Sequence, residues 1–359
     1  MYSRALKKLA LVACAAATPI LVGCDRASDL DRSPSDAAQR AVSSDTLVGA
    51  ILYAGEELGR PQAIGVVGGW VLVSDIPRPH ALHVIDRATG RYLAGWGREG
   101  KGPGEFLRVW GIVGAADGAT AWLYDPDQSR LTHVDIGALV SGSAEPHRAM
   151  VNLVGDVVPM TALWLGDSVI VSSGIFTRGR LAYFDRNGRA ARTAGPLPPS
   201  TSGAPVTVAQ HAYSGTMVRH PQGRRLAILT RHADRIEIYT EDGQPVRVSR
   251  GPGAFDPAYE VRIRGNEPSM ATGADLRFGY VEGTAAGEHI YALYSGRTRG
   301  ERGKSHFGGE VHVFDWEGKL LRILPLDERA LAITVDPDER TLYTIRHDPE
   351  PAVLRYELP

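Results

Sequence analysis

Two strand-like patterns recur together six times along this chain of 359 residues, and this recurrence limits the folds that it can adopt. One pattern is an apolar run that ends in an acidic or polar residue, and it occurs at 82–86, 131–135, 181–185, 236–240, 311–315 and 353–357. The other pattern is also an apolar run, and it lies N-terminal to the one just described each time, at 70–75, 121–125, 168–172, 225–230, 289–294 and 341–345. A period of roughly 50 residues predicts similar structural units that pack side by side.

Each unit has the composition of antiparallel β-structure. From residue 46 onward, short apolar runs alternate with turn residues, and no helical period persists. Six units of three or four strands each are typical of a β-propeller. We therefore predict an all-β fold over residues 46–359: a six-bladed β-propeller with four-stranded antiparallel blades. The last unit lacks an outer strand, so we expect strand 46–53 to complete it and close the ring.

The segment 95–112 joins the first two units. Its run of Gly and Pro excludes a helix or a central strand, and a weaker copy occurs at 250–255. We expect Phe106 to wedge between the two blades. With its GPGEF run, the segment resembles the inter-blade signature of NHL-type and TolB-like six-bladed propellers, a group that includes bacterial lipoproteins. The resemblance covers roughly residues 46–359 and implies the fold and the group, but no reaction.

The N-terminus indicates export. Residues 1–23 have a basic start followed by an apolar stretch, which is typical of a secretory signal peptide. The peptide ends in Leu-Val-Gly before Cys24, which resembles the bacterial lipobox, whose Cys is lipidated. We predict lipidation of Cys24, a flexible tether over 24–45, and anchoring to a bacterial envelope membrane, inner or outer. The alternative is an ordinary signal peptide followed by an incidental Cys.

Charge narrows the class of partner. The formal net charge of the chain is −1, from 40 basic and 41 acidic residues. Removal of residues 1–23 takes away three basic residues and no acidic ones, which leaves 37 against 41, or −4. A nearly neutral chain gives no reason to expect a nucleic-acid partner. We expect a monomer that binds an envelope protein, a peptide or a glycan.

Propellers bind ligands in the channel and on the loops of one face. In the usual strand order, that face carries the loops between the second and third strands of each blade. The candidate ligand-binding residues from these loops are Arg78, His80, Arg178, Arg231, His232, Arg297, Arg346 and His347. One interpretation is a basic face that binds an anionic group through guanidinium forks. The other is that exposed loops of an Arg-rich chain carry Arg balanced by nearby acidic residues, with no ligand.

The sequence contains no evident catalytic motif. It has no G-x-S-x-G elbow, no P-loop and no H-E-x-x-H pair. His83 and His312 occupy the same place in two units, which favours a structural role. His211, His220, His232 and His347 could still gather near the channel.

We therefore predict a lipid-anchored binding or scaffold module without a cofactor and without catalytic residues. The alternative is a lactonase- or lyase-like propeller enzyme that acts on a small molecule or glycan through a channel Ca²⁺ or Zn²⁺.

Overall fold

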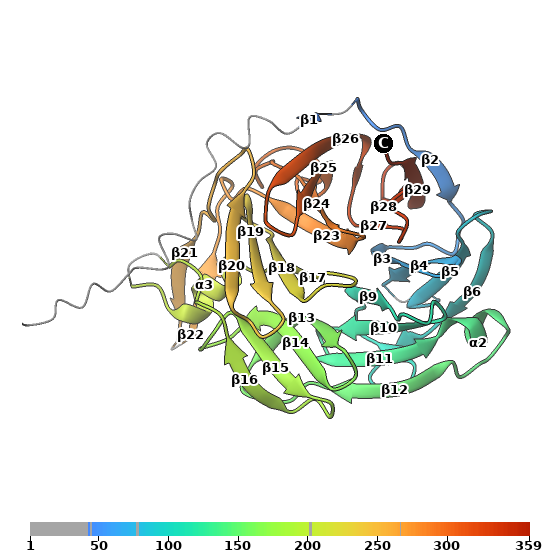
Figure 1. The fold of residues 1–359 in the computed structure, drawn as a ribbon, viewed down its shortest axis with the longest axis horizontal. Helices are drawn as coiled ribbons and strands as arrows, with labels where there is room; N and C mark the ends of the chain where they lie inside the picture. Colours follow the sequence, from blue (N-terminus) through green and yellow to red (C-terminus); the bar gives the residue numbers. More distant parts are fainter. Residues whose placement is uncertain (1–41, 44, 77–78, 201–202, 266) are drawn as a thin grey trace, which may run out of the picture.

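The computed structural model describes residues 42–43, 45–76, 79–200, 203–265 and 267–359. It arranges six β-sheets around a central axis, and the chain passes through them in order around the ring (Figure 1). In the described part, the α-helices are two short segments, α2 (Ile136–Val140) and α3 (Val206–Ala212). The predicted all-β fold with six four-stranded blades is confirmed.

Each of the first five blades is a sheet of four consecutive antiparallel strands that starts at the channel. Blade one contains β3 (Pro61–Val67), β4 (Trp70–Asp75), β5 (Leu82–Asp86) and β6 (Tyr92–Trp96), and blade two contains β9 (Gly111–Gly114), β10 (Thr120–Asp125), β11 (Arg130–Asp135) and β12 (His147–Asn152). Blade three contains β13 (Val158–Leu165), β14 (Val169–Ile175), β15 (Leu181–Asp185) and β16 (Ala190–Ala194), and blade four contains β17 (Gly215–Arg219), β18 (Arg225–Thr230), β19 (Arg235–Thr240) and β20 (Pro245–Arg250). Blade five contains β23 (Tyr280–Ala286), β24 (His289–Tyr294), β25 (Gly308–Asp315) and β26 (Leu320–Ala330).

The ring closes as predicted, through an N-terminal strand. Blade six contains β27 (Ile333–Val335), β28 (Thr341–Arg346) and β29 (Ala352–Glu357), and its outer strand is β2 (Ala50–Tyr53). Strand β2 runs antiparallel to β29, with Ala50 opposite Arg355. The Tyr53 ring stacks on Tyr92 of blade one, with 5.7 Å between centroids. A short strand β1 (Val42–Ser43) pairs in parallel with β26.

The core consists of apolar layers between neighbouring blades. Phe106 lies in one of these layers, fully buried between blades one and two, with its ring at the edge of Trp96. The prediction that Phe106 wedges between these blades is therefore confirmed. The connector around it is held by β7 (Arg98–Glu99) and β8 (Glu105–Phe106), which pair in parallel. Another connector forms a hairpin of β21 (Glu260–Arg264) and β22 (Glu267–Ala271).

Aspartates at the ends of strands hold the connectors in place. Asp75 accepts the N–H groups of Gly59 and Arg60, both at 2.6 Å. Asp125 and Asp234 accept backbone N–H groups of the connectors that follow β6 and β20 in the same way. Carboxylates that accept several backbone N–H groups fix a loop without further packing. These hydrogen bonds therefore fix the positions of the connectors on this face of the ring.

The aspartates that end three of the third strands hold the turns that follow them. Asp86, Asp185 and Asp315 accept N–H groups in the hairpin turns that follow them. Asp135 instead caps α2 by accepting the N–H of Ala138.

In the part of the chain that the structure describes, no helix is long and apolar enough to cross a membrane.

Candidate functional site

The loops between the second and third strands all lie on one face of the ring, because successive strands within each blade are antiparallel. The connectors between blades lie on the same face. We call this the loop face, and we call the opposite side, which carries the tighter hairpins, the hairpin face. The described members of the predicted ligand-binding set belong to this loop face, and the structure determines which of them meet.

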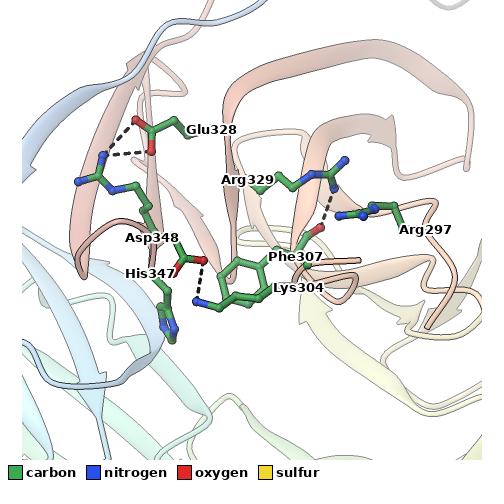
Figure 2. A pocket seen from close by; sticks show the side chains of 9 residues that line it. Arg297, Lys304, Phe307, Glu328, Arg329, His347 and Asp348 are labelled. Carbon is green, nitrogen blue, oxygen red and sulfur yellow. Dashed lines mark hydrogen bonds and ion pairs between the residues drawn. The ribbon is translucent and has the colours of Figure 1, made fainter. Parts of the chain in front are cut away.

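A pocket with a volume of about 290 Å³ lies on the loop face where blades five and six meet. Figure 2 shows side chains of the two blades converging on it. We call it the blade five–six pocket, and its lining residues are Arg297, Gly303, Lys304, Phe307, Glu328, Arg329, Arg346, His347 and Asp348. Three of the predicted residues, Arg297, Arg346 and His347, therefore lie in one pocket.

Ion pairs hold most of the charged side chains in this pocket. Arg346 places one guanidinium nitrogen 3.0 and 3.1 Å from the two carboxylate oxygens of Glu328. The Lys304 ammonium lies 2.8 Å from Asp348, which joins the loops of blades five and six. Partly exposed pairs of this kind each contribute about 0–1 kcal/mol to stability. Their main effect here is to fix the position of the charges.

Arg329 differs from its neighbours, since no carboxylate lies within ion-pair distance of it in the described structure. Its Nη1 donates to the backbone oxygen of Phe307 at 3.1 Å. Burial lowers the pKa of Arg329, and the nearby Arg297 guanidinium lowers it further, against the effects of Glu301 and Glu310. Figure 2 shows the guanidinium groups of Arg297 and Arg329 turned toward each other. Two like charges thus face one another at the edge of the pocket.

Aromatic rings form the floor between the two loops. The Phe307 ring is buried, with the Lys304 ammonium 5.1 Å from its centroid and His347 at its edge. His347 Nε2 lies 2.8 Å from the backbone oxygen of Pro61, to which it donates. Burial lowers the pKa of His347, although the bond to Pro61 opposes this effect. His347 is therefore a neutral donor at pH 7 that ties blade six to blade one.

Arg231 and His232 lie nearer the channel, in blade four. His232 contacts Phe278, which contacts His306, the residue before Phe307. Burial lowers the pKa of His232 to about 3, and Arg231 and His211 add to the effect. Arg231 makes no side-chain hydrogen bond within the described residues, and burial lowers its pKa against the charge of Glu282. A path of aromatic rings thus links the predicted residues of blade four to the blade five–six pocket.

The remaining predicted residues do not join this site. Arg178 is exposed on the corresponding loop of blade three, and His80 packs beside His83 in blade one. Arg78 and Cys24 lie outside the described residues. His83 and His312 are fully buried, as a structural role requires. His220 lies on the hairpin face against Trp316, beside a hollow that His289 also lines.

Sequence reasoning missed Glu328 and Arg329. Both lie in β26, which has 11 residues and continues onto the loop face beyond the length of the other fourth strands. The repeating patterns covered only the second and third strand of each unit, so the length of an outer strand left no signal.

The described part of the chain contains no group of three or more His, Cys, Asp or Glu side chains that could hold a metal ion. Glu282 lies on the inner strand β23. It accepts a hydrogen bond from Thr216 at 2.8 Å and one from the N–H of Gly283, and burial raises its pKa.

The comparison with protein families agrees with this architecture. The family model for TolB-like six-bladed propellers matches residues 49–338, from the closing strand to the first strand of blade six. The chain belongs to this family. The TolB-like match confirms the resemblance read from the connector at 95–112. The sequence matches none of the curated proteins with which it was compared.

Solved structures share the fold at low sequence identity. One is a protein of Bacteroides fragilis NCTC 9343 named for its expected export, with 9% identity and a TM-score of 0.52, covering 88% of this chain and 96% of that one. Another is the β-propeller domain of Myceliophthora thermophila Cps50 (Swd1), with 10% identity and a TM-score of 0.50, covering 87% of this chain and all of that one. At these identities the likeness concerns the fold alone.

Proposed function

We propose that this TolB-like propeller is an exported, lipid-anchored binding module of a bacterial envelope. Its ligand, an envelope protein, a peptide or a glycan, is bound on the loop face at the blade five–six pocket. The observation that carries the proposal is the convergence of Arg297, Arg346 and His347 from two different blades into one pocket. Ligand sites are typically concave and carry a few fixed polar groups.

The pocket has the chemistry of recognition. Three of its four cations are held by ion pairs, and its histidine is neutral and donates to a backbone oxygen. The residues that line it include no Ser, Thr or Cys nucleophile. Fixed donors around a hollow recognise a complementary group without reacting with it. Export and anchoring are supported by the signal peptide, by Cys24, and by the expected export of the Bacteroides fragilis protein.

Replacement of Cys24 by serine tests the anchor. Acyl chains contribute about 0.8 kcal/mol per buried CH₂ to membrane binding, so a multiply acylated Cys holds a protein on a membrane. We expect the wild-type protein in the membrane pellet and the Cys24→Ser protein in the soluble envelope fraction. Both proteins are followed by immunoblotting after carbonate washing. Retention of the Cys24→Ser protein in the pellet would contradict the lipid anchor.

Site-specific photo-crosslinking in cells tests the binding face. A photoreactive phenylalanine is placed at Arg302, an exposed residue beside the pocket, and separately at Glu317, an exposed residue of a hairpin-face turn in the same blade. We expect a crosslinked species from position 302.

A further inference from the structure

We infer that the blade five–six pocket binds a carboxylate group, with Arg329 as its main anchor and Arg297 as the second cation. This inference rests on the proposed function, because it names the chemistry of the ligand that the pocket binds. The carboxylate belongs to a small organic acid or to the free end of a peptide.

Unused donors are concentrated on the two facing arginines. Arg329 uses Nη1 for the backbone oxygen of Phe307, and its Nε and Nη2 have no acceptor within the described residues. Arg297 gives Nε to Glu301 and Nη2 to the backbone oxygen of Arg302, while its Nη1 has no protein acceptor there. A guanidinium has five N–H donors in a rigid plane. Three nitrogens with unused donors are thus available at the edge of the pocket.

One of the cations that line the pocket has no ion-pair partner within the described residues. The pocket's four cations are Arg297, Lys304, Arg329 and Arg346. The carboxylates that pair with them are Glu301, Glu328 and Asp348, and Arg329 is the cation left over. The Glu310 carboxylate acts on Arg329 only from beyond ion-pair distance. One unpaired guanidinium fits a singly charged carboxylate, which it can bind through two parallel hydrogen bonds. An oxyanion placed between Arg297 and Arg329 would also relieve their mutual repulsion.

The geometry of the arginines favours a carboxylate. Its two oxygens match the fork of a guanidinium in two parallel hydrogen bonds. Both arginines are also held by the protein, because Arg329 donates to the backbone oxygen of Phe307 and Arg297 donates to Glu301 and to the backbone oxygen of Arg302. Fixed side chains lose little freedom when a ligand binds. The pocket, at about 290 Å³, has room for a carboxylate and a few adjoining atoms.

Calorimetry on the full lipidated chain in detergent tests the inference. The probes are N-acetyl-trialanine with a free carboxylate, the same peptide with a C-terminal amide, N-acetylalanine, and methyl phosphate. We expect the free carboxylates to bind at least about 10-fold more tightly than the amide, since a hydrogen bond to a charged group contributes about 1.5–3 kcal/mol. Tighter binding of the tripeptide than of N-acetylalanine would identify a peptide end, and equal binding would identify a small acid.

Variants locate the effect. Arg329→Gln is expected to weaken binding of the free carboxylate by about 10- to 100-fold. Arg329→Lys keeps the charge without the planar fork and should give a smaller loss. Arg178→Gln removes an exposed arginine from another loop of the same face and should change binding by less than about twofold. The melting temperature of each variant shows whether its fold is intact.

Several outcomes would overturn the inference while leaving the pocket as a binding site. Equal affinities for the free and the amidated peptide would show that the pocket does not recognise a carboxylate. Tighter binding of methyl phosphate than of the free carboxylates would show that the pocket prefers a dianion. An unchanged affinity of the Arg329→Gln variant for the free carboxylates would show that Arg329 does not bind them. If no probe binds but position 302 still crosslinks in cells, the carboxylate assignment fails and the proposed function stands.

Discussion

Replacement of Glu237 by glutamine is expected to lower the free energy of unfolding by about 3–5 kcal/mol, the usual cost of breaking a buried ion pair. Glu237 and Arg180 are almost fully buried between blades three and four, with Arg180 Nε 2.8 Å from the carboxylate. Arg235 and the Tyr239 hydroxyl also bind this carboxylate. Without its charge, two buried guanidinium groups lose their common counter-ion.

The same variant should alter the pH dependence of stability. Burial alone would raise the pKa of Glu237, but Arg180 and Arg235 hold it well below its usual value of 4.5. A carboxyl whose pKa is lower in the folded chain contributes its full stabilisation above its unfolded pKa and loses it as the pH falls toward the folded pKa. The difference between wild type and Glu237→Gln should therefore be constant near pH 7 and shrink below about pH 4.5.

Urea denaturation at several pH values measures both effects. Glu288→Gln is the matched control, because Glu288 is a largely exposed acid that pairs with His220. It should change stability by less than about 1 kcal/mol. A loss of similar size in the two variants at pH 7 would show that the Glu237 network does not hold blades three and four together.

Removal of the closing strand β2 should also lower the free energy of unfolding. A chain that starts at residue 55 lacks β2, and with it the Leu52 and Tyr53 side chains that pack between blades six and one. Full burial of such a side chain contributes about 1.5–3 kcal/mol, and these two are partly buried, so we expect a loss of about 2 kcal/mol. The truncation also exposes the edge of β29, which can pair with other chains.

Thermal unfolding and size-exclusion chromatography follow these changes. The control is a chain that starts at residue 46, which keeps β2 and the bridge between Leu47 and Leu326. We expect the control to be monomeric and the shorter chain to melt earlier and to associate. Equal melting temperatures and elution volumes for the two chains would contradict closure of the ring by β2.

The fold could be predicted because its units repeat. Six copies of one strand pattern outweigh errors in any single copy, and the hairpin turns at Gly188, Gly243 and Gly318 supply the positive φ that such turns need. The closing strand was found because blade six lacked a partner for its last strand. The hairpin at 260–271 was not foreseen, since it occurs once and no repeat supports it.

The pocket could be predicted only in part. Arg297, Arg346 and His347 were found because loops between second and third strands can be located from the repeat. Their meeting could not be predicted, because it depends on the conformation of the insertion at 295–307. Arg329 lies in an outer strand that is longer than those of the other blades, and this length depends on packing against its neighbours.

The measurement that tests the central claim most directly is the comparison of crosslinking from positions 302 and 317 in the same cells. Both side chains are exposed in blade five, but they lie on opposite faces of the ring. Binding at the blade five–six pocket predicts a discrete crosslinked species from position 302, reduced by Arg329→Gln and unchanged by Arg178→Gln. It predicts no such species from position 317. A species from 317 with none from 302 would contradict the account, because it would place the binding surface on the hairpin face.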